Sequence, residues 1–355
     1  MDNVLRHFKK AAQKGGSALS KVAEVFDSQD PLIILPYRGY ANAERVFLKG
    51  RVLEDENIFQ GKSQSEIRNL IDSFKRFETD EMPNAKVEVS INNQDFSAVT
   101  DEEGYFTIDE KWQTAPQKDA DNRWISANLD LREVPKKEVP SVTAKGEIYY
   151  PSYNADYGII TDVDDTVLQT HVTSLFRLKM LYATFIQDGS QRLPMEGIVE
   201  LFQAYVRGGD GKKENPIFYV SNSPWNLYDL LEEFLTVQKL PKGPILLRDY
   251  GIQPSGDFSG HKLNSISHIL EMYPNLPFVM LGDTASKDAD FYIDLAKKYP
   301  NRIKAIYIRQ TRNTKNARRV AKLIEKYSNI NAVLVNESKE MIEHGRKIGL
   351  LHFER

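Results

Sequence analysis

Residues 155–167 read Ala-Asp-Tyr-Gly-Ile-Ile-Thr-Asp-Val-Asp-Asp-Thr-Val. The apolar part of this stretch, around Ile159 and Ile160, is typical of a short buried strand. Asp162, Asp164 and Asp165 follow at the carboxyl end of that strand. Burying several carboxylates together is unfavourable unless a positive charge lies beside them. Because ligands of open α/β sheets bind at the carboxyl ends of strands, the stretch predicts a divalent-cation and phosphate site.

The composition is that of an ordinary globular protein and excludes several kinds of chemistry. The chain has 355 residues, which predicts two domains. Its net charge of −3 gives no argument for binding nucleic acid. The absence of cysteine excludes disulfides, thiolate metal sites and cysteine nucleophiles. The sequence has neither an apolar run of roughly 20 residues nor a signal-peptide core, so we expect a cytoplasmic protein.

Residues 1–29 are predicted to form an amphipathic N-terminal helix. Apolar residues recur at helical spacing from Leu5 to Phe26, and basic residues occupy much of the remaining surface. A basic amphipathic helix either lies on an anionic membrane or docks on its own domain, and the sequence leaves both alternatives open. Gly15 and Gly16 weaken a single continuous helix.

Residues 30–150 are predicted to form a β-sandwich domain with a helical insertion at residues 67–77. Short strands separated by turn signals are typical of such a sandwich. The run from Thr100 to Phe106, Thr-Asp-x-x-Gly-x-Phe, resembles the carboxypeptidase-regulatory-like sandwich, a structural and binding module. The expected strands are residues 32–35, 46–53, 87–91, 105–108, 124–131 and 142–150.

Residues 151–355 alternate short apolar runs with longer amphipathic stretches, which predicts an α/β domain with a mostly parallel sheet. One helix is expected from Trp225 to Val237, with Ser223 as its N-cap and Pro224 at its first position. After the strand at Ile159, the expected strands are residues 217–220, 245–247, 278–281, 303–308 and 332–335.

Four polar motifs follow in order along this second domain. They are Asp162-x-Asp164-x-Thr166, then Ser221-Asn222-Ser223, then Lys262 near the start of a helix, then Gly282-Asp283 followed by Asp288. This order resembles the four motifs of the haloacid dehalogenase superfamily, and implies a Rossmann-like sheet of that type. Taken alone, Ser221 also suits a turn, Asp283 a helix cap, Lys262 an exposed helix start, and Asp288 a position that complements a helix dipole.

The resemblance implies a role for each matching position in a phosphatase. Asp162 is implied as the nucleophile that forms an aspartyl-phosphate, and Asp164 as the acid and base. The implied phosphate-binding residues are Ser221, Asn222, Lys262 and Arg248. The implied ligands of Mg²⁺ are Asp162, Asp164, Asp283 and Asp288.

A narrower resemblance is to the actin-patch-associated phosphatidate phosphatase family. It covers about residues 150–350, and Val220-Ser-Asn-Ser-Pro-Trp225 is its most specific part. It also includes Leu247-Arg-Asp-Tyr-Gly251 and His261-Lys262. The sequence departs at residues 284–287, where a Ser-Gly-Gln-like run is expected. The resemblance implies Mg²⁺-dependent conversion of phosphatidate to diacylglycerol, with a phospholipid as the bound partner and peripheral membrane contact.

Two other functions stay open from the residues alone. The same chemistry on a soluble phosphomonoester needs no change in the four motifs. A non-catalytic membrane or protein adaptor would work through the sandwich and the N-terminal helix, although it has no need of the motifs. The apolar residues 172–186 suit either a lid for acyl chains or a helix packed on the sheet, and Trp225 suits either the membrane interface or the core.

Overall fold

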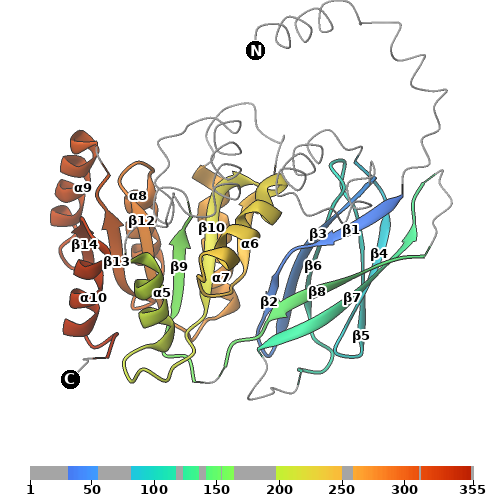
Figure 1. The fold of residues 1–355 in the computed structure, drawn as a ribbon, viewed down its shortest axis with the longest axis horizontal. Helices are drawn as coiled ribbons and strands as arrows, with labels where there is room; N and C mark the ends of the chain where they lie inside the picture. The colour runs from blue at the N-terminus through green and yellow to red at the C-terminus, as the bar shows by residue number, and fades with distance from the viewer. Residues whose placement is uncertain are drawn as a thin grey trace, which may run out of the picture.

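The computed structural model describes residues 31–54, 81–116, 123–135, 141–152, 154–163, 197–249, 259–311 and 313–352. The predicted N-terminal helix, the helical insertion at 67–77, the apolar segment at 172–186 and the second half of the first motif, Asp164 to Thr166, lie outside these residues. In the described part the strands form two sheets, a mixed one and a parallel one (Figure 1).

The mixed sheet contains the strands from the first part of the chain, in the order β1-β3-β2-β8-β7-β4-β5, with β6 paired to β3. Its pairs are antiparallel except β2 with β8. Asn92 and Asn93 form the turn between β4 and β5, and both residues have the positive φ that a tight hairpin requires. The strands are β1 Leu32–Pro36, β2 Gly39–Ala41, β3 Arg45–Glu54, β4 Lys86–Ile91, β5 Gln94–Val99, β6 Tyr105–Lys111, β7 Trp124–Glu133 and β8 Val142–Tyr149.

All six strands of the second sheet run parallel, in the order β11-β10-β9-β12-β13-β14. The first of them, β9, lies in the middle, and the chain builds outward to β11 before it returns to β12 on the other side. The expected α/β class with a parallel sheet is therefore confirmed. The strands are β9 Gly158–Asp162, β10 Ile217–Pro224, β11 Ile245–Arg248, β12 Phe278–Asp283, β13 Ile303–Arg309 and β14 Ala332–Val335.

Helices cover both faces of the parallel sheet (Figure 1). Each face of this sheet is apolar and packs in its own hydrophobic core: Ile159 of β9 lies in one core, and the next residue, Ile160, lies in the other. The first core contains α5 Ile198–Arg207, α6 Tyr228–Val237 and α10 Ser338–Lys347, and the second contains α7 Ser259–Met272, α8 Asp288–Lys298 and α9 Thr314–Lys326. No helix in the described ranges is long and apolar enough to cross a membrane.

The prediction that Ser223 caps a helix beginning at Trp225 is wrong. Strand β10 continues through Pro224, which pairs with Arg248, and a single 3-10 turn at Trp225–Leu227 precedes α6. The N-cap residues are Pro224 for that turn and Leu227 for α6, and the Ser223 N–H donates to Ser221 Oγ at 2.9 Å. Sheet pairing therefore outweighs the local Ser-Pro signal.

The mixed sheet lies beside the end of the parallel sheet that carries β10, α6 and α7 (Figure 1). Trp225 is 5 % exposed and stacks on Tyr37 of the mixed sheet, with ring centroids 4.3 Å apart. The Tyr40 hydroxyl lies 2.6 Å from Nδ1 of His268 on α7. Of the two alternatives for Trp225, the structure shows the core position.

Candidate active site

Three predicted residues come from the carboxyl ends of neighbouring strands. Asp162 is the last residue of β9 and Asp283 the last of β12, on one side of it. On the other side, Val220 of β10 pairs with Asp162, so Ser221 is the next residue beyond that pair. All three side chains are buried. The strand order reverses direction at β9, which is where open α/β sheets bind ligands.

Lys262 connects two of the predicted aspartates. Its Nζ lies 3.0 Å from Oδ1 of Asp162 and 2.5 Å from Oδ1 of Asp288. The lysine is 1 % exposed. Burial lowers the pKa of its ammonium, but the two carboxylates raise it by more, so the pKa of Lys262 lies above its ordinary value and the group stays charged. Lys262 is therefore a buried structural cation as well as a candidate phosphate ligand.

Asp288 is fixed by the turn that follows β12. It is fully buried as the first residue of α8, and its N–H donates to Ser286 Oγ at 3.2 Å. A Cβ at Gly282 would lie 2.5 Å from Asp288 Oδ2, closer than atoms can approach. The glycine of the Gly-Asp motif is thus required for Asp288 to reach Lys262.

Asp283 is held by backbone amides and not by a helix start. Its Oδ1 accepts hydrogen bonds from Ala285 N at 2.5 Å and Ser286 N at 2.9 Å. Because α8 begins at Asp288, the alternative of a helix cap at Asp283 is wrong. Burial raises the pKa of its carboxyl, and the nearby charge of Asp288 raises it further. The ionised form of Asp283 therefore favours a cation beside it.

Three of the predicted phosphate-binding residues lie towards the ends of β10 and β11: Ser221, Asn222 and Arg248. Arg248 donates through Nε to the Asn222 carbonyl oxygen at 3.1 Å and through Nη1 to that of Asp249 at 3.4 Å. The Oδ1 atom of Asn222 is buried and has no hydrogen-bond partner among the described residues. Arg248 thus holds the backbone after β10 and β11 through two carbonyl oxygens, while Oδ1 of Asn222 has no partner among the described residues.

His261 lies next to Lys262, and sequence analysis assigned it no role. Burial lowers the pKa of its imidazole to about 4, against the opposing effect of Asp249, so the ring is neutral at pH 7. Lys49, Arg248 and Lys262 are close enough to lower it further. Within the described ranges its Nε2 is buried without a hydrogen-bond partner. The only sequence signal for it was its place beside the motif lysine.

The described residues fit a hard divalent cation. Asp162, Asp283 and Asp288 each offer one carboxylate oxygen, and these atoms lie within 4.8 Å of one another. Three carboxylates against the single ammonium of Lys262 leave two negative charges to neutralise in a buried place. Carboxylate oxygens are the donors that Mg²⁺ and Ca²⁺ prefer. The predicted fourth ligand, Asp164, lies outside the described residues.

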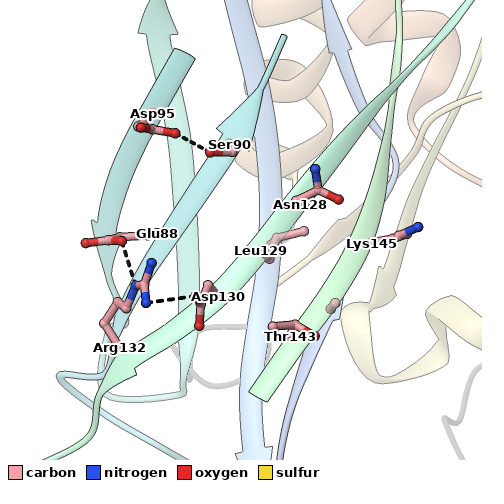
Figure 2. Close-up of a pocket in the computed structure, with 10 residues that line it drawn as sticks. Glu88, Ser90, Asp95, Asn128, Leu129, Asp130, Arg132, Thr143 and Lys145 are labelled. Carbon is pink, nitrogen blue, oxygen red and sulfur yellow. Dashed lines mark hydrogen bonds and ion pairs between the residues drawn. The ribbon is translucent and has the colours of Figure 1, made fainter. Parts of the chain in front are cut away.

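A cavity of about 530 Å³ lies on the mixed sheet. Figure 2 shows Arg132 between Glu88 and Asp130, and Ser90 beside Asp95. The Arg132 Nε atom lies 2.6 Å from Glu88 and Nη1 lies 3.0 Å from Asp130. Arg132, Glu88 and Asp130 thus pair with one another, as charged groups do on a solvated sheet face.

Comparison with known proteins bears directly on this edge. Residues 157–310 match the family model of the catalytic domain of Phosphatidate phosphatase APP1. The expected resemblance is confirmed. The matched segment runs from the start of β9 to the end of β13, so it contains Asp162, Ser221, Lys262, Asp283 and Asp288.

Two curated relatives extend the resemblance. Phosphatidate phosphatase APP1 of Saccharomyces cerevisiae is 33 % identical over 178 residues, which is 47 % of this chain and 28 % of the yeast protein. An uncharacterized protein of Schizosaccharomyces pombe is 27 % identical over 265 residues, 72 % of this chain and 41 % of that protein. The chain thus spans less than half the length of either relative.

Solved structures add nothing to this comparison. A carbohydrate acetylesterase from Xanthomonas citri aligns at 10 % identity with a TM-score of 0.25, over 75 % of this chain and 65 % of the esterase. A score this low carries no argument about fold or activity.

Proposed function

We propose that this protein is a Mg²⁺-dependent phosphatase that converts phosphatidate to diacylglycerol through an aspartyl-phosphate. One observation carries the proposal: Lys262 joins Asp162 and Asp288 in a buried cluster beside Asp283. The cluster lies inside the segment that matches the phosphatidate phosphatase catalytic domain. Phosphoryl transfer through an aspartyl-phosphate needs a carboxylate nucleophile and a cation that neutralises phosphoryl charge, and this cluster offers both.

The finer description of the fold belongs to the same proposal. We assign residues 151–355 to a haloacid dehalogenase-type domain, residues 30–150 to a β-sandwich, and residues 1–29 to the helix. The central position of β9 and the four motifs at strand ends support the first assignment. The separate core of the mixed sheet, around Val46, Val89 and Leu129, supports the second.

Substrate binding follows from the charges at the edge. The phosphate dianion of the substrate enters beside the Lys262 ammonium, which neutralises part of its charge. The Ser221 hydroxyl and the Asn222 side chain bind its oxygens from the end of β10. Arg248, which already braces Asn222, adds a second positive charge at the rim.

The reaction then proceeds in two displacements. A carboxylate oxygen of Asp162 forms a bond to phosphorus while the bond from phosphorus to the alcohol oxygen breaks, and Asp164 gives that oxygen a proton. Water next attacks phosphorus and loses a proton to Asp164. The P–O bond to Asp162 breaks, which releases phosphate and restores the carboxylate.

The buried aspartates supply the cofactor site for these steps. Asp162, Asp283 and Asp164 would hold Mg²⁺, with Asp288 as a further ligand or as the residue that positions Lys262. When bound, Mg²⁺ neutralises charge on the phosphoryl oxygens. The contact of Asp288 with Lys262 supports the positioning role.

The mechanism is tested by Asp162→Asn in the full-length chain. The variant keeps the volume of the side chain and removes its nucleophile, so Mg²⁺-dependent phosphate release should fall to background. Asp294→Asn, an exposed aspartate on α8, is the matched control and should keep full activity. Turnover by Asp162→Asn at the wild-type rate would refute an aspartyl-phosphate.

The substrate is tested by comparing phosphatidate in mixed micelles with a panel of soluble phosphomonoesters. A lipid substrate predicts preference for phosphatidate and a rate that falls as it is diluted in the micelle surface. Equal or faster turnover of a soluble ester, with no effect of surface dilution, would assign the same chemistry to a soluble substrate.

Cytoplasmic location with peripheral membrane contact and no nucleic-acid partner completes the proposal. It is supported by the net charge of −3 and by the implied lipid substrate. Liposome binding that needs residues 1–27, together with no turnover of any phosphomonoester, would instead indicate an adaptor.

A further inference from the structure

One face of strand β3 in the mixed sheet contacts the parallel-sheet unit along its length. Val46, Leu48 and Val52 point into the core of the mixed sheet. The alternate residues point the other way, because side chains alternate along a strand. Phe47 lies against the ring of His268 on α7, with centroids 4.9 Å apart, and the Arg51 Nη1 atom lies 3.4 Å from Asn226 Oδ1. Between these contacts lies Lys49.

Lys49 reaches the carboxyl edge of the parallel sheet. Its Nζ lies 2.5 Å from Oδ1 of Asp249, the residue that follows β11. The lysine side chain is 13 % exposed, and that of Asp249 is 35 % exposed. The ammonium also lies 4.9 Å from the ring centroid of Tyr105 and 5.6 Å from that of Trp225. Aromatic faces and a carboxylate therefore fix this ammonium in one place.

The Lys49–Asp249 pair lies beside the proposed phosphate-binding residues. Asp249 directly follows Arg248, whose Nη1 donates to the Asp249 carbonyl oxygen. Lys49, Asp249 and Lys262 are all close enough to His261 to act on its ring. The pair thus lies at the same edge as Lys262. The carboxylate of Asp249 is a negative charge close to the place where an anionic substrate would bind.

We propose that Lys49 is a positioning residue of the substrate site: it holds Asp249 at the carboxyl edge and cancels its charge where a phosphate monoester dianion binds. This inference rests on the proposed function, and it makes the mixed sheet part of the phosphatase site. Removing the ammonium leaves a carboxylate without its ion pair beside the path of the dianion. Like charges repel, and salt screens the repulsion between groups near the surface.

Lys242 offers a control, because it lies before the start of β11, whereas Asp249 follows the end of that strand. Lys242, shortly before β11, pairs with Glu147 of the mixed sheet at 2.7 Å and lies 4.3 Å from the ring centroid of Trp124. It therefore combines an ion pair between the sheets with an aromatic contact, as Lys49 does, but at the amino end. Lys242 is more exposed than Lys49, at 41 % against 13 %, and a purely docking role predicts that both Lys49→Met and Lys242→Met weaken phosphate binding.

The test measures binding of inorganic phosphate to the full-length protein with Mg²⁺ by titration calorimetry, and KM and kcat for phosphatidate in micelles. At low ionic strength Lys49→Met should weaken phosphate binding and raise KM by about 3- to 10-fold, with kcat changed less. High salt should shrink the difference. Asp249→Asn in the Lys49→Met background should restore binding, and Lys242→Met should leave it unchanged.

Several outcomes would overturn the inference. They are wild-type phosphate affinity in Lys49→Met, an equal loss in Lys242→Met, no recovery in the double variant, and absence of phosphate binding by the wild type. If the wild type binds phosphate but releases none from any ester, the proposed function fails, and the titrations still decide the role of Lys49. If turnover is normal and Lys49→Met binds like wild type, the inference alone fails.

Discussion

At the carboxyl edge of the parallel sheet, the sequence predicted which residues are present but not every contact between them. Asp162, Ser221 and Asp283 were predicted together from the order of the four motifs, and each of the three follows an apolar run that forms a strand of the parallel sheet. The contact of Lys262 with Asp288 was not predicted, since it joins the starts of two helices on one face of the sheet. Sequence spacing shows where a helix starts but not how far its lysine reaches.

Lys262→Met should destabilise the metal-free protein strongly. It removes the cation that pairs with both Asp162 and Asp288, and breaking a buried ion pair costs about 3–5 kcal/mol. Chemical unfolding with a chelator present measures this free energy. Lys287→Met, at an exposed lysine beside Asp288, is the control and should stay near wild type. Equal unfolding midpoints for the two variants would contradict the prediction.

His261 should make the protein sensitive to acid. Its pKa is about 4 in the folded state and 6.5 ordinarily, so the stability that it contributes is present above pH 6.5 and is lost as the pH falls towards 4. His261→Gln should lose less stability than wild type across that window. Unfolding free energies measured at pH 7 and at pH 5 give the comparison, with His352→Gln near the C-terminus as control. Parallel pH profiles for wild type and His261→Gln would refute the assignment.

Among the elements, those with continuous apolar runs were predicted best. Most residues of strands β9 to β13 are buried on both faces, so their sequences carry the signal directly. Strand β2 has three residues and strand β5 alternates half-buried with exposed ones, which left both without a clear pattern. The wrong helix start at Ser223 has another cause, because pairing of Pro224 with Arg248 extends β10 past a local signal.

The connection from β12 to α8 should tolerate no side chain at Gly282. In Gly282→Ala the new Cβ meets Asp288 Oδ2, so Asp288 must move away from Lys262, at a cost of about 1–3 kcal/mol. Both the unfolding free energy and phosphatase activity should fall.

Gly260→Ala is the matched control for Gly282→Ala. A Cβ at Gly260 of α7 meets nothing within 4 Å, and alanine favours a helix over glycine by about 1 kcal/mol. It should be neutral or stabilising, with activity kept. If Gly282→Ala behaves as Gly260→Ala does, the tight packing of Asp288 is not needed for function.

The whole molecule has an interface that the sequence did not reveal. The change of periodicity predicted a domain boundary at about residue 150. The contacts between the two parts, however, join residues far apart in the sequence, such as Lys49 and Asp249. Tyr37, Tyr105 and Tyr40 of the first part pack within the cores of the parallel sheet. Their sequence neighbourhoods are those of ordinary strands, so no local pattern reports the contact.

A fragment of residues 151–355 should therefore be less stable than the full chain. Removal of the mixed sheet uncovers Trp225 and leaves His268 without Tyr40, a loss of at least ~3 kcal/mol from apolar burial alone. Thermal unfolding followed by circular dichroism compares the two proteins. A fragment that melts with the full chain and keeps its phosphate affinity would show that the parallel sheet is independent.

The central place of β9 also sets the order in which the chain can fold during synthesis. Ile159 pairs with Ile217 on one side and with Val279 on the other. The nascent strand therefore emerges from the ribosome with both edges open, and the second edge closes only after β12 has followed it. Exposed strand edges favour aggregation, so the nascent chain needs protection by chaperones during this interval more than the folded protein does.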